Sequence, residues 1–175
     1  YLRALTLDAA TKLVRIADDP FEGRVEISTE LVFHPPRSFT DQVLGDNFIR
    51  VFVDRTTGRA AYQIYQTLIY LGDGRHFDRV NIMMPEGLTS APLTRINDEI
   101  KQCTTADMCV RTETVGFDLS EAEMEAIAAM PPATDGTSAL LRFRFKSNTS
   151  YDWNDDLPAV EAAALLSTLK KWRTE

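Results

Sequence analysis

With 26 acidic side chains against 19 basic ones and a net charge of −7 over 175 residues, the chain is an acidic protein of single-domain size. We therefore expect one globular domain over residues 1–175, which needs no metal or disulfide to fold because a chain of this length buries roughly 70% of its unfolded surface. We expect no cofactor. The negative charge argues against nucleic acid and anionic lipid as partners, and no apolar run approaches the ~20 residues of a transmembrane helix.

The first part of the chain predicts short elements separated by proline-containing turns. Residues 1–10 have apolar positions at near-helical spacing, which predicts a short helix or an ordered tail. Residues 11–17 are rich in strand formers and end at a turn around Pro20. Residues 24–33 alternate between apolar and polar, as a half-buried strand does. Residues 38–45 are compatible with one turn of helix.

A long β-hairpin is the most distinctive prediction. Residues 48–53 and 60–71 are runs of β-branched and aromatic side chains, and the turn between them contains Gly58. Both faces of the second run are partly apolar, which favours a central strand over an edge strand. Further strands are predicted at 77–84, 93–103 and 110–117.

The last third of the chain predicts two helices around one strand. Ser120 and Glu123 form a capping-box pattern, which predicts a helix at about 120–130. Residues 139–147 alternate strictly and predict a strand, residues 148–156 read as a polar loop, and residues 158–172 predict a helix. The expected fold class is α+β: an antiparallel sheet of about six to eight strands, with these two helices packed on one face.

The only two cysteines, Cys103 and Cys109, predict a disulfide. Five residues separate them, which suits a loop that joins two antiparallel strands. The alternatives are two free thiols or half of a metal site. Because sparse, paired cysteines favour an oxidising compartment, we expect an extracytoplasmic protein, periplasmic or secreted, from which a signal peptide has been removed.

The motifs of several enzyme classes are missing. The chain has no Gly-x-Ser-x-Gly, no glycine-rich phosphate or dinucleotide loop and no His-Glu-x-x-His. We therefore assign no catalytic residue and no metal ligand. The two histidines, His34 and His76, lie beside predicted strand ends and are the candidates for a general base that works with a nearby carboxylate.

One face of the predicted strand 139–147 presents three cations: Arg142, Arg144 and Lys146. These side chains are suited to bind a carboxylate or phosphate ligand. The alternative is that they pair with acidic residues of a neighbouring strand. Asp152, Asn154 and Asp156 alternate as in a calcium loop, but Leu157 and Ala163 replace its glycine and glutamate, so a polar loop is the expectation.

These observations favour a non-catalytic binding or envelope-associated domain, whose partner is a protein or a small anionic ligand. One alternative is a hydrolase-type enzyme that uses His34 or His76. The other is a homo-oligomeric structural protein, in which a second chain completes the two-sided hairpin.

Overall fold

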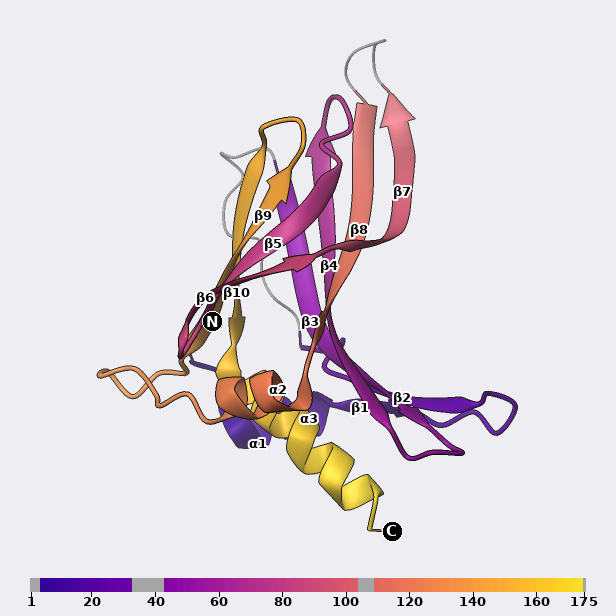
Figure 1. Ribbon diagram of the computed structural model, residues 1–175, viewed down its shortest axis with the longest axis vertical. Coiled ribbons are helices and arrows are strands. Elements are labelled where there is room, and N and C mark those ends of the chain that lie inside the picture. The colour runs from indigo at the N-terminus through magenta and orange to yellow at the C-terminus, as the bar shows by residue number, and fades with distance from the viewer. Residues whose placement is uncertain (1–3, 33–42, 104–108, 175) are drawn as a thin grey trace.

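Two antiparallel sheets face each other in the computed structural model, and three helices lie together at one end (Figure 1). The structure describes residues 4–32, 43–103 and 109–174. The six-stranded sheet A has the order β1-β2-β3-β4-β8-β7, and the four-stranded sheet B has the order β10-β9-β5-β6. In chain order the elements are α1 (Leu7–Leu13), β1 (Arg15–Ala17), β2 (Arg24–Ser28), β3 (Val43–Asp54), β4 (Ala60–Leu71), β5 (Phe77–Met84), β6 (Gly87–Pro92), β7 (Thr94–Cys103), β8 (Cys109–Leu119), α2 (Glu121–Ala128), β9 (Leu140–Ser147), β10 (Asp152–Pro158) and α3 (Ala159–Trp172).

The predicted central hairpin is confirmed as β3 and β4. Its turn contains Gly58 at φ 68°, a left-handed conformation that glycine adopts without steric cost. The Asp54 carboxylate accepts hydrogen bonds from the backbone N–H groups of Thr56 and Thr57. The hydrogen bonds from the backbone and hydroxyl of Thr57 hold the pKa of Asp54 below its ordinary value. As predicted, β4 is a central strand, paired with β3 on one side and β8 on the other.

The inner faces of the two sheets bury each other. Strand alternation places Leu141, Phe143 and Phe145 of β9 inward. The Phe145 ring makes edge-to-face contacts with Phe77, Phe117 and Phe143, at centroid distances of 6.2, 6.2 and 5.4 Å. Because Phe117 belongs to sheet A and the other rings to sheet B, this aromatic cluster joins the two sheets.

The helices lie together at one end of the two sheets (Figure 1). Helix α3 contacts β2 and β3 of sheet A and β10 of sheet B, while α2 contacts β4 and β5. Buried apolar residues of α2 and of α3 belong to the same core as the inward residues of both sheets. The capping box of Ser120 and Glu123 is confirmed at the start of α2. None of the described helices has the length and apolar character that a bilayer crossing requires.

Three parts of the sequence prediction are wrong in detail. Ten strands in two sheets replace the expected six to eight in one. A third helix, α1, takes up residues 11–13, which were predicted as strand, because Thr6 caps it by accepting a hydrogen bond from the Ala9 N–H at 3.2 Å. The predicted polar loop at 148–156 is largely β10, in which Asp155 and Leu157 are buried while Asp152 and Asn154 are exposed. The helical turn proposed at 38–45 falls partly outside the described residues, and its last three residues belong to β3.

The predicted disulfide is confirmed. Cys103 and Cys109 are opposite each other at the end of the β7–β8 pair, with an S–S distance of 2.01 Å and a Cα–Cα distance of 3.9 Å. This bond closes the far tip of the hairpin, at the end of the molecule away from the helices (Figure 1).

Candidate functional site

The outer face of sheet B arranges its side chains in rows that cross the four strands. Residues opposite each other in neighbouring strands point to the same side of a sheet, so the register fixes the members of each row. The rows are Leu88, Met83, Arg142 and Asp156; then Ser90, Asn81, Arg144 and Asn154; then Pro92, Arg79, Lys146 and Asp152. Each of the three predicted cations therefore occupies its own row.

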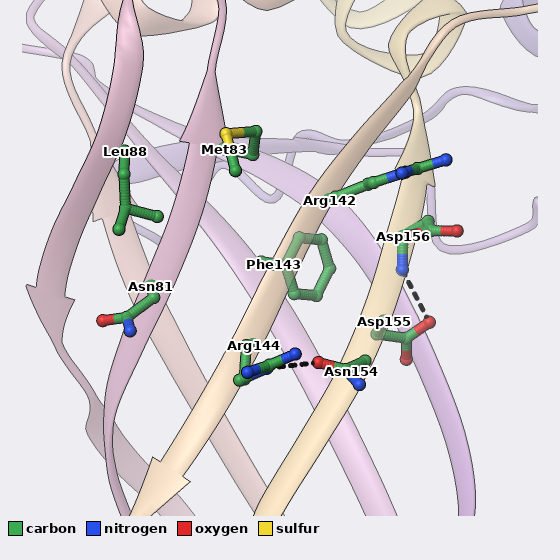
Figure 2. A pocket seen from close by; sticks show the side chains of 9 residues that line it. All are labelled: Asn81, Met83, Leu88, Arg142, Phe143, Arg144, Asn154, Asp155 and Asp156. Carbon is green, nitrogen blue, oxygen red and sulfur yellow. Dashed lines mark hydrogen bonds between the residues drawn. The ribbon is translucent and has the colours of Figure 1, made fainter.

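A cavity of about 440 Å³ lies over the first two rows. Figure 2 shows Met83 and Leu88 on one side of it and the two arginines with residues of β10 on the other. Met83 and Leu88 are 55% and 66% exposed and lie opposite each other in the β5–β6 pair, so together they form an apolar surface. The cavity thus combines an apolar wall with a polar wall of arginine, asparagine and aspartate side chains.

The three cations have different surroundings. The Lys146 ammonium donates to the Asp152 carboxylate at 2.6 Å and lies outside the cavity. Arg144 lines the cavity and donates from Nε to the neutral amide oxygen of Asn154 at 2.7 Å. Arg142 lines the cavity and makes no hydrogen bond or ion pair with any residue that the structure describes. The structure therefore brings Arg142 and Arg144 to one site and pairs Lys146 elsewhere.

The acidic residues of β10 divide between the two faces of the strand. Asp156 lies opposite Arg142 on the outer face. Asp155 is buried on the inner side, where one of its oxygens accepts the Asp156 N–H at 2.9 Å. The lining of the cavity thus holds two exposed arginines and two aspartates, of which Asp155 is buried and Asp156 is half-buried.

His76 is the one candidate general base that can be placed, because His34 lies outside the described residues. Its Nδ1 is 3.3 Å from Nη2 of Arg95 and 4.0 Å from the Asp98 carboxylate. Since a guanidinium can only donate, Nδ1 accepts here and the proton of the neutral ring is on Nε2. A carboxylate-oriented general base needs the opposite arrangement, with Nδ1–H donating to the carboxylate. The hydrolase alternative stays a prediction.

A buried carboxylate near His76 was not predicted from the sequence. Glu113 of β8 is 0% exposed and accepts hydrogen bonds from the Tyr70 hydroxyl at 2.8 Å and the Phe77 N–H at 2.9 Å. The sequence does hold a signal for it, because Glu113 falls on the same strand face as the core residues Val115 and Phe117. Burial, assisted by the hydrogen bond to Glu113, raises the pKa of Tyr70 to about 12.

The raised pKa of Tyr70 predicts a loss of stability at high pH. The folded-state pKa of about 12 exceeds the ordinary value of 10.0, so the folded state holds its proton longer than the unfolded state does. The protonated Tyr70 therefore contributes to the free energy of unfolding in full below pH 10. This contribution, roughly 2–3 kcal/mol in total, is lost as the pH rises towards 12. Denaturant unfolding at a series of pH values should show that the free energy of unfolding falls more steeply between pH 10 and 12 in the wild type than in Tyr70→Phe. Parallel pH profiles of the two proteins would contradict this.

Comparisons of the chain with family models, with curated proteins and with solved structures return no match.

Proposed function

We propose that this chain is an extracytoplasmic binding domain without catalytic activity, and that it takes a small anion with an apolar portion in the cavity of sheet B. The observation that supports this most is the position of Arg142, which has no partner in the described part of the chain and lies on the row that holds the exposed Met83 and Leu88.

The chemistry of the cavity suits such a ligand. A guanidinium binds a carboxylate through two parallel charge-assisted hydrogen bonds, which are roughly twice as strong as neutral ones. Arg144 adds further donors beside Arg142, since only its Nε is engaged by Asn154. An alkyl or aryl group on the ligand would cover Met83 and Leu88, and each CH₂ removed from water contributes about 0.8 kcal/mol.

The disulfide supports the proposed compartment, because such bonds persist mainly in oxidising surroundings. The homo-oligomer remains an untested alternative. Light scattering of the purified chain distinguishes it, since the binding-domain proposal does not require a second copy.

The decisive experiment is calorimetric titration of the full chain with decanoate. We expect saturable binding, and Arg142→Ala should weaken it about tenfold because one charge-assisted contact is lost. Lys146→Ala is the matched control: it removes a cation from the same strand face, but one that is paired with Asp152 and lies outside the cavity. It should leave the affinity unchanged.

Two further probes separate charge from apolar contact. Decanol keeps the alkyl chain but has no charge, and decylamine reverses the charge. Decanoate should bind more tightly than decanol, and decylamine should bind least. Equal affinities for all three, or an equal loss in the Lys146 and Arg142 variants, would contradict an arginine-directed anion site.

A further inference from the structure

A second group of charged side chains meets where the turn between β4 and β5 folds against β7 and β8, near the end of the molecule away from the helices (Figure 1). This group, the His76 cluster, consists of His76, Arg95, Asp98 and Arg111. Asp98 is opposite the buried Glu113 in the sheet, and Arg111 is opposite the buried Tyr70. Opposite residues share a face, so Asp98 and Arg111 are on the inner side of sheet A.

Two guanidinium groups flank the Asp98 carboxylate without hydrogen-bonding to it. Nη1 of Arg95 is 3.8 Å from Oδ2 and Nη1 of Arg111 is 3.7 Å from Oδ1, while the imidazole of His76 lies beside them, with Nδ1 4.0 Å from Oδ2. Hydrogen bonds between a guanidinium and a carboxylate measure about 2.7–2.9 Å, so neither arginine is within hydrogen-bond distance of the carboxylate. The donors that face it are therefore not saturated by it.

The cluster also has an excess of positive charge. Two arginines against one aspartate leave one positive charge even when the imidazole is neutral. Three further charged residues belong to the surroundings of the cluster: Arg75, whose guanidinium packs over the Tyr70 ring at 4.6 Å, the buried Glu113, and Asp73 in the turn that carries His76. In a chain with a net charge of −7, such a local excess favours an anion.

The backbone holds the His76 ring in place. His76 has φ 52°, a left-handed conformation that is uncommon outside glycine. Both of its neighbours are fixed by the buried network, since the Arg75 N–H donates to the Tyr70 hydroxyl and the Phe77 N–H donates to Glu113, each at 2.9 Å. The ring lies against Gly74, where an added Cβ would be 2.7 Å from Nε2. A rigid, unusual backbone that aims a side chain at a charge cluster is typical of binding sites.

We propose that the His76 cluster is a binding site for a phosphate group, which takes the place of the Asp98 carboxylate between Arg95 and Arg111. The two guanidinium groups approach from different strands, β7 and β8, and the His76 ring lies beside them on the turn before β5. The planar Asp98 carboxylate is not within hydrogen-bond distance of either guanidinium. A tetrahedral oxyanion has enough oxygens to accept hydrogen bonds from both arginines. This site is separate from the cavity of sheet B and does not depend on the function proposed for that cavity.

The test is titration of the full chain with inorganic phosphate, followed by NMR of the imidazole signals. The chain has only two histidines, so the signals of His76 are readily assigned with a His34 variant. The His76 signals should shift in a saturable way. Asp98→Asn, which removes the competing charge, should tighten binding about tenfold, and Arg95→Ala should weaken it about tenfold. Lys146→Ala, which changes net charge as much as Arg95→Ala does but away from the cluster, should leave binding unchanged.

Tighter binding by Asp98→Asn cannot result from misfolding, so it keeps the test decisive if an arginine variant proves unstable. Unchanged or weaker binding by Asp98→Asn would overturn the proposal, as would equal losses in the Arg95 and Lys146 variants. Vesicles with and without phosphatidic acid distinguish a free phosphate group from a lipid one. Binding to the acidic vesicles without any response to inorganic phosphate would also overturn the proposal of a free anion.

Discussion

Replacing Glu113 with alanine is expected to lower the free energy of unfolding by roughly 3–5 kcal/mol. The Glu113 side chain is fully buried and is the acceptor for both the Tyr70 hydroxyl and the Phe77 N–H. Removing it leaves two buried donors without a partner, each at a cost of about 1–3 kcal/mol, and also leaves a cavity. Denaturant unfolding at neutral pH measures the loss.

A matched control lies on the neighbouring strand. Glu99 of β7 is exposed, and among the residues that the structure describes it pairs with Lys101 alone, at 2.9 Å, so Glu99→Ala should change stability by less than about 0.5 kcal/mol. Glu113→Gln keeps one acceptor oxygen and should show an intermediate loss. Equal effects of the alanine variants at 99 and 113 would show that the buried network contributes little. A double-mutant cycle with Tyr70→Phe then isolates the hydrogen bond itself.

The elements that the sequence predicted well are those with a strong local pattern. The hairpin of β3 and β4 and the strands β5 and β9 alternate clearly, and the helix at 121–128 has its capping box. Such signals depend only on residues close together in the sequence, so they predict these elements correctly regardless of the tertiary contacts. The division into two sheets has no local signal. It depends on the chain passing directly from β6 of sheet B to β7 of sheet A around Leu93.

The missed strands show the same dependence on distant partners. Strand β6 is exposed along most of its length and has no apolar alternation, so only its pairing with β5 identifies it. Strand β10 has the composition of a loop, because its outward residues are polar. They lie opposite the cations of β9 and do not contribute to the core. Asp152, Asn154 and Asp156 alternate because they lie on one face of the strand β10, so their spacing does not indicate a calcium-binding loop.

The sequence predicted which strand face carries the candidate site, but not which residues pair with one another there. Alternation in β9 correctly placed Arg142, Arg144 and Lys146 together on the outer side. Which of them stays available depends on the register with β10, and that register pairs Lys146 with Asp152. For His76 the decisive partners come from β7, where a bulge follows Arg95, and no pattern in the sequence indicates that approach.

The second large effect concerns the aromatic cluster between the sheets. Phe145→Ala is expected to lower the free energy of unfolding by about 3–5 kcal/mol, because the ring is completely buried and its loss leaves a cavity. Phe52→Ala is the matched control: the Phe52 ring is only partly buried, on the outer face of sheet A under the guanidinium groups of Arg24 and Arg50, so this substitution should cost only about 1 kcal/mol.

The Phe145 substitution also tests whether the two sheets unfold together. Phe145 of sheet B contacts Phe117 of sheet A, so the cavity removes contacts from both. If residues 1–175 form one cooperative domain, hydrogen exchange of β4 and β8 should accelerate as much as that of β5 and β9, with a single unfolding transition. Acceleration confined to sheet B, with sheet A still protected, would show that the sheets are separate folding units and that the cluster does not couple them.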